Sequence, residues 1–332
     1  MQSMQHQYIE RYSGFPCSEP LFGDRLIGLL YHRVREHAPS LFRLVTTPRV
    51  TDILGFVNYD LPFGGSACQR FLKELKVDLD ECLDPPGELN TARKVFQRRI
   101  RYEECRPMPE DPSAVVSPAD ARVLVGSCSE TSSLFIKDKF FSFPELLGER
   151  LWDDAFRDGD FALFRLTPDK YHYNHAPVSG QVLDIFPIDG VFNSCNPNAI
   201  VAVATPYSKN RRVVTVIDTD VSGGTGVGLV AMVEVVALMI GDIVQCYSEI
   251  GYLNPRTVTP GMHLKKGQPK SLYRPGSSTD IVIFQKGRVD FASDLLENQR
   301  RTDVASRFSR GFQSALVETD IKVRSLLATG RR

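Results

Sequence analysis

GQPKSLYRPGSSTDIVIF, residues 267–284, joins a polar turn to an apolar run. The turn contains Gly276, Ser277 and Ser278, and the run 281–284 is rich in β-branched residues. Glycine and serine favour tight turns, whereas β-branched residues favour strands. The stretch therefore predicts a tight turn that leads into a buried strand, with two serines where the strand begins.

The same pattern occurs earlier in the chain, where short apolar runs alternate with turn residues. Strands are predicted at 122–126, 161–166, 181–186, 199–204, 212–218, 228–237, 242–247 and 281–285. The glycine-rich segment GGTGVG at 223–228 precedes a strand instead of following one, so it predicts a hairpin and not a dinucleotide-binding turn. Only one short helix is expected among them, near 144–150, which indicates a mainly antiparallel sheet or sandwich.

Helical patterns dominate residues 21–110. Amphipathic segments follow Phe22, cover 41–57 and 68–77, and are joined by a short helix candidate at 89–100. Their apolar faces suit packing on the protein body or contact with a bilayer interface, and both readings stay open. The arginines at 98–106 fit either a solvated face or a site for an anion such as phosphate.

These patterns predict an α+β chain in three parts. Residues 1–20 are polar and expected to be loosely ordered, residues 21–110 are helical and can associate with a membrane, and residues 111–332 form a β-rich body. From Ser293 onward the charged tail has a helical pattern.

Composition narrows the class of protein. The 332 residues contain 40 basic and 40 acidic side chains, and this neutrality predicts no nucleic-acid partner. Seven cysteines without a CxxC pair or zinc-ligand spacing indicate reduced thiols, no metal and a cytoplasmic protein. The longest apolar run, 227–240, is interrupted by Glu234 and is too short to span a bilayer, so membrane contact is expected to be peripheral.

Three groups of polar residues stand at predicted strand ends. Asp120 closes the turn Ser117-Pro-Ala-Asp, His172 and His175 follow the strand at 161–166, and the serines open the strand at 281–285. A serine, a histidine and an aspartate can form a nucleophile, base and orienting group. A turn aspartate, two packed histidines and a turn serine would explain the same residues without chemistry.

Together these stretches resemble the pyruvoyl-dependent phosphatidylserine decarboxylases. Ser117–Asp120 is similar to the aspartate motif of that family, and RLTPDKYHYNHAPV at 165–178 is similar to its two-histidine motif. Residues 267–286 resemble the end of the proenzyme, where members carry Leu-Gly-Ser-Thr or Gly-Gly-Ser-Thr. Weaker likenesses lie at 96–107, 188–200 and 233–237.

The resemblance implies a β-rich decarboxylase domain that cuts itself near 277/278. A serine hydroxyl attacks the preceding carbonyl, β-elimination splits the chain, and a pyruvoyl cofactor remains that forms a Schiff base with the substrate amine. Asp120, His175 and one serine are carried over as the self-processing group, and His172 as a residue that contacts the substrate or transfers a proton; either His172 or His175 would reprotonate the carbanion. Spacing from both ends of the motif selects Ser278, while the preceding glycine would favour Ser277.

The implied enzyme is a carboxy-lyase that converts phosphatidylserine to phosphatidylethanolamine and CO2 at the membrane periphery. The sequence is also compatible with a homo-oligomer. Ala121 and Val236 stand where the family usually has glycine, and 269–271 depart from the usual acidic residue and glycine. Two alternatives therefore stay open, a soluble relative that decarboxylates a free amino acid and an unprocessed lipid-binding pseudoenzyme.

Overall fold

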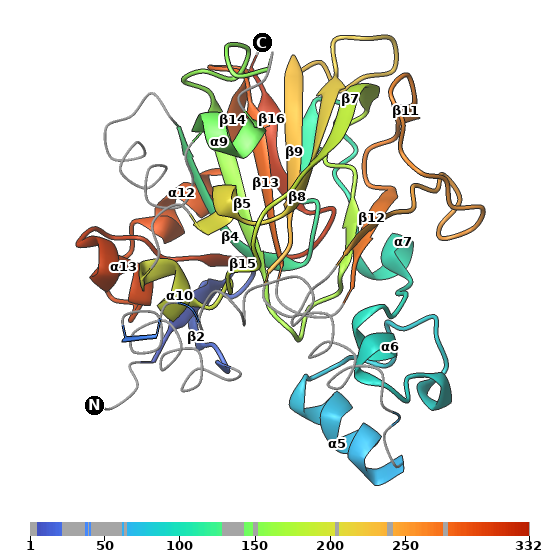
Figure 1. The fold of residues 1–332 in the computed structure, drawn as a ribbon, viewed down its shortest axis with the longest axis vertical. Coiled ribbons are helices and arrows are strands. Elements are labelled where there is room, and N and C mark those ends of the chain that lie inside the picture. The colour runs from blue at the N-terminus through green and yellow to red at the C-terminus, as the bar shows by residue number, and fades with distance from the viewer. Residues whose placement is uncertain are drawn as a thin grey trace.

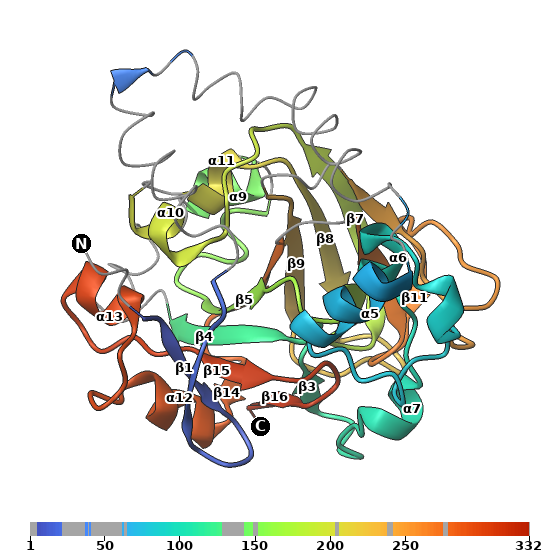
Figure 2. The ribbon, with the colours of Figure 1, turned by 90° about the horizontal axis from the view of Figure 1, so that it is seen from below.

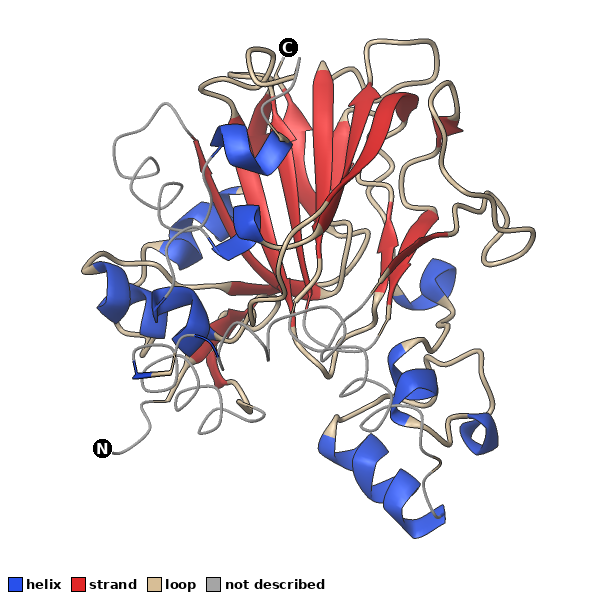
Figure 3. Ribbon diagram, viewed as in Figure 1, coloured by secondary structure: helices blue, strands red, loops and turns tan. Residues whose placement is uncertain are grey.

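A ten-stranded sheet dominates the protein and fans through the centre of Figure 1 and Figure 3. The computed structural model describes residues 5–21, 37–38, 40, 62, 65–127, 143–148, 152–202, 206–237, 242–274 and 278–331. The strand order is β11-β7-β8-β9-β13-β5-β4-β15-β1-β2, and all neighbours are antiparallel except β1 and β15. The strands are β1 Gln7–Glu10, β2 Pro16–Ser18, β4 Ala121–Ser127, β5 Asp160–Leu166, β7 Gly180–Ile188, β8 Arg212–Asp218, β9 Leu229–Val235, β11 His263–Leu264, β13 Ser278–Phe284 and β15 Thr319–Ile321.

Two three-stranded sheets cover one face of the large sheet. One has the order β10-β12-β6 (Ile243–Gln245, Pro269–Tyr273 and Tyr173–His175), and the other β14-β16-β3 (Val289–Phe291, Leu326–Gly330 and Ala114–Val116). Val282 and Phe284 of β13 share a core with Tyr273 of β12 and Leu327 of β16. This side of the protein is therefore a β-sandwich.

Helices cover the opposite face, where Ile281 and Ile283 of β13 share a second core with residues of α9, α10, α11 and α13. These helices are α9 Phe143–Leu147, α10 Pro197–Ala202, α11 Pro206–Lys209 and α13 Arg307–Phe312, and α12 Ser293–Gln299 contacts β4. The remaining helical elements lie together on one side of the body (Figure 1, Figure 2), namely α5 Gly65–Glu74, η2 Pro86–Glu88, α6 Ala92–Phe96 and α7 Tyr102–Cys105. Within the described part of the chain, no helix combines the length and apolar character needed to cross a bilayer.

The structure confirms the predicted sheet-dominated, mainly antiparallel body, including the 223–228 hairpin between β8 and β9. One predicted strand is wrong, because residues 197–202 form α10. The side chain of Asn196 accepts the backbone N–H of Asn198 at 2.9 Å, and Pro197 occupies the first helical position. An Asn followed by Pro is thus a helix start here and not merely a turn.

The two chain ends also differ from expectation. Residues 5–21 are not loosely ordered but form β1 and β2, and the tail is helical only in α12 and α13 before it forms β15 and β16. β1 pairs with β15, so blue and red segments lie side by side in Figures 1 and 2. The amphipathic segments at 22–57 lie outside the described residues except for short pieces, whereas the segment at 68–77 corresponds to α5.

A buried ion cluster ties these ends to the centre of the sheet. Arg165 on β5 donates to Glu19 at 2.6 and 2.8 Å and to Glu318 at 2.6 and 2.9 Å. His6 lies 2.9 Å from Glu318, and all four residues are buried. Although burial alone would raise the pKa of Glu318, the charge of Arg165 holds it well below its usual value. The polar N-terminus is ordered because its His6 and Glu19 are partners of this arginine.

Replacing Arg165 with methionine should therefore destabilise the fold strongly. The change removes the arginine that bonds to both buried carboxylates, which costs about 3–5 kcal/mol in the free energy of unfolding. Urea denaturation of the full chain measures this loss. Arg157→Met is the control, because its partner Asp154 is exposed and such pairs contribute less than about 1 kcal/mol. Equal losses in the two variants would contradict the role of the cluster.

Candidate active site

Ser278 begins β13 and lies opposite Leu166, the last residue of β5. Its side chain is fully buried, and its Oγ has no hydrogen-bond partner among the described residues. Alternation along the strand places Ser278 on the same face as Val282 and Phe284, beneath the small sheet that contains the histidines. Ser277 lies outside the described residues.

His175 ends β6 and is fully buried. Its Nδ1 lies 2.8 Å from the carbonyl of Gly267, so Nδ1 carries the proton and Nε2 accepts from the hydroxyl of Tyr171 at 2.9 Å. Tyr171 in turn contacts the hydroxyl of Tyr252 at 2.7 Å. Burial lowers the pKa of His175 to about 3, which keeps the imidazole neutral.

His172 is equally buried but has a free ring nitrogen. Its Nδ1 donates to the carbonyl of Lys170 at 2.8 Å, and no described group contacts its Nε2. The ring packs on Phe96 with centroids 4.3 Å apart. Burial, reinforced by the charge of Arg98, lowers the pKa of His172 to about 3. His172 is thus a neutral base whose lone pair has no protein partner among the described residues.

Asp120 is an ionised carboxylate held by an arginine. Arg106 donates to its two oxygens at 2.8 and 3.1 Å, and the backbone N–H of Val323 donates at 2.8 Å. Burial opposes ionisation, but Arg106 outweighs it and lowers the pKa of Asp120 to about 2. The Asp120 and histidine segments are adjacent, since the N–H of His175 donates to the carbonyl of Pro118 at 2.7 Å. The carboxylate itself is bonded to Arg106 and not to His175.

The arginines at 98–106 are mostly occupied by the protein itself. Arg98 donates to the carbonyls of Val95 and Asp169, and Arg106 pairs with Asp120 and Glu81. Both are buried, so neither presents the solvated face that the sequence suggested. Arg99 and Arg101 are more exposed, and they pair with Asp84 and Glu104. This cluster therefore positions Asp120 and the helices around it.

Sequence reasoning missed a buried polar network on β9, β12 and β13. Glu234 accepts from Lys270 at 2.7 Å and from Gln245 at 2.8 Å, and it also contacts Ser271. Asp280 lies directly opposite Glu234 in the register of β13 and β9. Glu234 and Asp280 were the signals, because each is an acidic residue inside an apolar strand.

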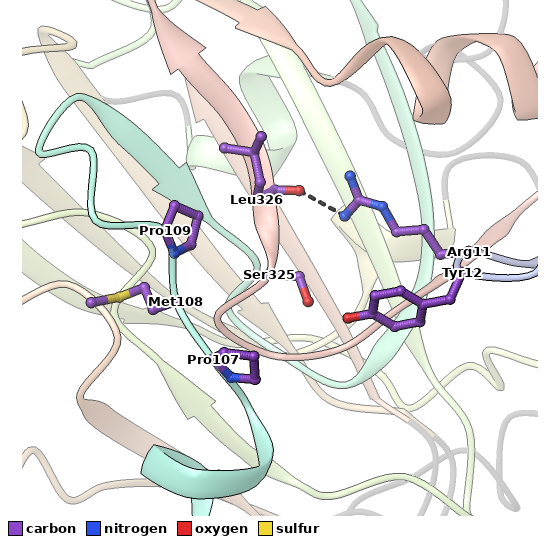
Figure 4. Close-up of a pocket in the computed structure, with 7 residues that line it drawn as sticks. All are labelled: Arg11, Tyr12, Pro107, Met108, Pro109, Ser325 and Leu326. Atoms are coloured by element: carbon purple, nitrogen blue, oxygen red, sulfur yellow. Dashed lines mark hydrogen bonds between the residues drawn. The ribbon is translucent and has the colours of Figure 1, made fainter.

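A pocket of about 420 Å³ opens beside the Asp120 segment (Figure 4). Its lining residues are Arg11, Tyr12, Pro107, Met108, Pro109, Ser325 and Leu326. Arg11 points at the carbonyl of Leu326, 2.7 Å away, and the carbonyl of Ser325 accepts from the N–H of Ser117 at 2.8 Å. Neither the histidines nor Ser278 line this pocket, so it is not an opening to the predicted reacting groups.

A buried serine, two buried neutral histidines and a buried ionised aspartate thus lie on or beside the antiparallel sheet. Comparison with known proteins identifies the class. A family model described as "Phosphatidylserine decarboxylase" matches residues 92–310. The chain therefore belongs to the phosphatidylserine decarboxylase family, whose members are carboxy-lyases.

Individual relatives agree with the family model. The phosphatidylserine decarboxylase proenzyme of Fusobacterium nucleatum subsp. nucleatum is 27% identical over 293 residues, which cover 88% of this chain and 91% of the relative. The Chlamydia pneumoniae proenzyme is 28% identical over 295 residues, 89% of this chain and 92% of the relative. Phosphatidylserine decarboxylase proenzyme 2 of Oryza sativa subsp. japonica is 32% identical over 239 residues, 70% of this chain and 36% of the relative.

The neutral histidines predict a pH-dependent stability. Their pKa values of about 3 lie below the ordinary value of 6.5, so the unfolded chain binds more protons as the pH falls. The free energy of unfolding should be at its full value above pH 6.5 and fall towards pH 3, by about 1.4 kcal/mol per pH unit for each histidine. Urea denaturation at several pH values measures this slope.

His172→Gln should remove one histidine's share of the slope. The control is His263→Gln, which makes the same substitution at an exposed histidine. An unaltered slope in His172→Gln would show that His172 is not buried in its neutral form.

Proposed function

We propose that this chain is a self-processing decarboxylase that converts phosphatidylserine to phosphatidylethanolamine and CO2. The observation that carries the proposal is Ser278, whose buried hydroxyl has no partner among the described residues and stands at the start of a central strand. Leaving a buried hydroxyl unpaired costs free energy, and such costs concentrate at functional sites. Family membership supplies the reaction class.

Asp120, His175 and Ser278 are proposed as the self-processing group. The Pro118–His175 backbone bond supports the proximity of the first two, and the neutral imidazole can act as a base when its Nε2 is released from the Tyr171 hydroxyl. Asp120 acts in this scheme through Arg106 and the local backbone, since Gly267 and Tyr171 orient the His175 ring. His172, with its free Nε2, is proposed to accept a proton from the substrate ammonium group and to return it to the substrate carbon from which CO2 departs.

The pyruvoyl group is proposed to arise from Ser278, with Ser277 as the alternative. Such a group supplies a carbonyl that condenses with the substrate amine and accepts electron density from the carbon that loses CO2. The surroundings of Ser278 fit it, because the position is fully buried and water is kept away from a reactive carbonyl. Tyr273 of β12 contacts both parts of the proposed site. Its backbone N–H donates to the carbonyl of His172 at 3.1 Å, and its hydroxyl contacts Thr279 and Asp280 of β13.

Intact mass tests the processing and identifies the serine. Purified protein should contain two chains, the smaller of about 6 kDa from the roughly 55 residues after the cut. Ser278→Ala should abolish splitting, whereas Ser277→Ala should retain it. The opposite pattern would transfer the assignment to Ser277, and a single full-length species in the unaltered protein would leave the pseudoenzyme as the remaining interpretation.

Bilayer contact is proposed through the turn at 249–254. Ile250 and Leu253 are 66% and 62% exposed, which is unusual for aliphatic side chains. Between them Tyr252 turns inward, and its hydroxyl contacts Tyr171, the partner of His175. An apolar turn attached to the site would bring the lipid headgroup towards the histidines while its own side chains enter the interface.

The double variant Ile250→Asp/Leu253→Asp should weaken binding to vesicles of mixed phosphatidylserine and phosphatidylcholine by about tenfold or more, because two aliphatic anchors are lost. Sedimentation with the vesicles measures the bound fraction. Phe15→Asp is the control, since Phe15 is 70% exposed at the opposite edge of the sheet. Turnover of free serine without vesicle binding by the unaltered protein would favour the soluble relative.

A further inference from the structure

Asp280 is a buried acid two residues along β13 from Ser278. It is fully buried, and one of its oxygens, Oδ2, has no partner among the described residues. Alternate residues of a strand share a face and lie about 7 Å apart. Ser278 and Asp280 therefore present a hydroxyl and a carboxyl oxygen, both buried and both unpaired, over the same part of the sheet.

Hydrogen bonds around Tyr273 determine where the proton of this acid lies. The Tyr273 hydroxyl oxygen accepts from the N–H of Val235 at 3.0 Å and also lies 2.9 Å from the carbonyl of Thr279 and 2.7 Å from Oδ1 of Asp280. A phenol has one proton, and a carbonyl has none. Both contacts are satisfied only when Tyr273 donates to Thr279 and Asp280 donates to Tyr273. Asp280 is then a neutral carboxylic acid, and Oδ2 is its carbonyl oxygen.

The neighbouring carboxyl explains why Asp280 stays neutral. Glu234, opposite on β9, is fully buried and holds Lys270 and Gln245, so it takes the local positive charge. Among the described residues no cation contacts Asp280, which forms a hydrogen bond with Tyr273. Burial, together with the charge of Glu234, raises the pKa of Asp280 well above its ordinary value. Two adjacent acids thus have opposite protonation states.

We infer that Asp280 is a positioning residue for self-processing, whose carbonyl oxygen Oδ2 accepts a hydrogen bond from the hydroxyl group of Ser278 and so orients the Oγ lone pairs for attack. The inference rests on the proposed role of Ser278. A neutral acceptor suits this task, because it holds the hydroxyl without removing its proton, which is left for the histidine. The two oxygens form no direct hydrogen bond in the structure, and one water can bridge positions that lie about 7 Å apart.

The rate of cleavage after cell-free synthesis of the full chain tests this role. Asp280→Val fills the space but has no acceptor, and it should slow formation of the smaller chain by about tenfold or more. Asp280→Asn reproduces a neutral acid, with N–H in place of O–H towards Tyr273 and a carbonyl towards Ser278. It should cleave at least about fivefold faster than Asp280→Val. An ionised Asp280 acting as a base would instead make both variants equally slow, which would overturn the inference.

Matched controls separate orientation from folding. Thr215→Val removes another buried and unpaired hydroxyl, on β8, and should cleave at the unaltered rate. In a Ser278→Ala background, Asp280→Val should change the midpoint of thermal unfolding little, because it removes the unsatisfied Oδ2 together with the hydrogen bond to Tyr273. If Asp280→Val unfolds the protein, the cleavage rate of Asp280→Asn relative to the unaltered chain tests the inference on its own, and a rate as low as that expected for Asp280→Val would overturn it. In the same background, infrared spectroscopy should show the carbonyl stretch of a protonated carboxyl that disappears in Asp280→Asn.

The outcomes also separate this inference from the proposed function. Normal cleavage in Asp280→Val, with no cleavage in Ser278→Ala, would remove the role of Asp280 and leave the serine assignment intact. Cleavage in Ser278→Ala would remove the serine assignment first, and with it the reason for Asp280 to act.

Discussion

β13 is hydrogen-bonded on both sides and buried on both faces, and the arrangement of the site depends on this constraint. It pairs with β5 from Ser278 to Phe284 and with β9 from Thr279 to Phe284. One face meets the small sheets and the other meets helices. Any polar side chain on such a strand must find a partner inside the protein or remain unsatisfied. Ser278 and Asp280 therefore stand out in this strand, because each has a buried oxygen without a partner among the described residues.

Burial and neighbouring charges also determine which groups of the candidate site are protonated. Asp120 stays ionised because Arg106 is its partner, whereas burial lowers the pKa of His172 and of His175 and so keeps both imidazoles neutral. Within hydrogen-bonding networks of this kind, the position of each proton follows from neighbouring donors and acceptors more than from the surrounding solution. The site thus offers neutral bases and fixed hydroxyls, which suits a reaction that begins with a poor nucleophile.

Much of this could be predicted from local patterns. The apolar strands, the 223–228 hairpin and the segments around Asp120 and the histidines needed only residues close in sequence. The N-terminal strands could not be predicted, because His6 and Glu19 are polar and are ordered by contacts with Arg165 and Glu318, which lie far along the chain. The partners of Asp120 and His175 were missed for the same reason, since Arg106 and Gly267 reach them through tertiary contacts.

The Arg165 cluster has a consequence for the order of events in maturation. With a cut at Ser278, Arg165 and Glu19 would belong to the larger fragment and Glu318 to the smaller one. Strand β13 of the smaller fragment would lie between β9 and β5 of the larger fragment. The boundary between fragments is then the interior of a single domain, so their dissociation and global unfolding are the same event. Folding would then have to precede scission, because fragments synthesised separately would have to insert β13 into the middle of the ten-stranded sheet. A protein cut in this way would be a permanent heterodimer that exchanges no subunits.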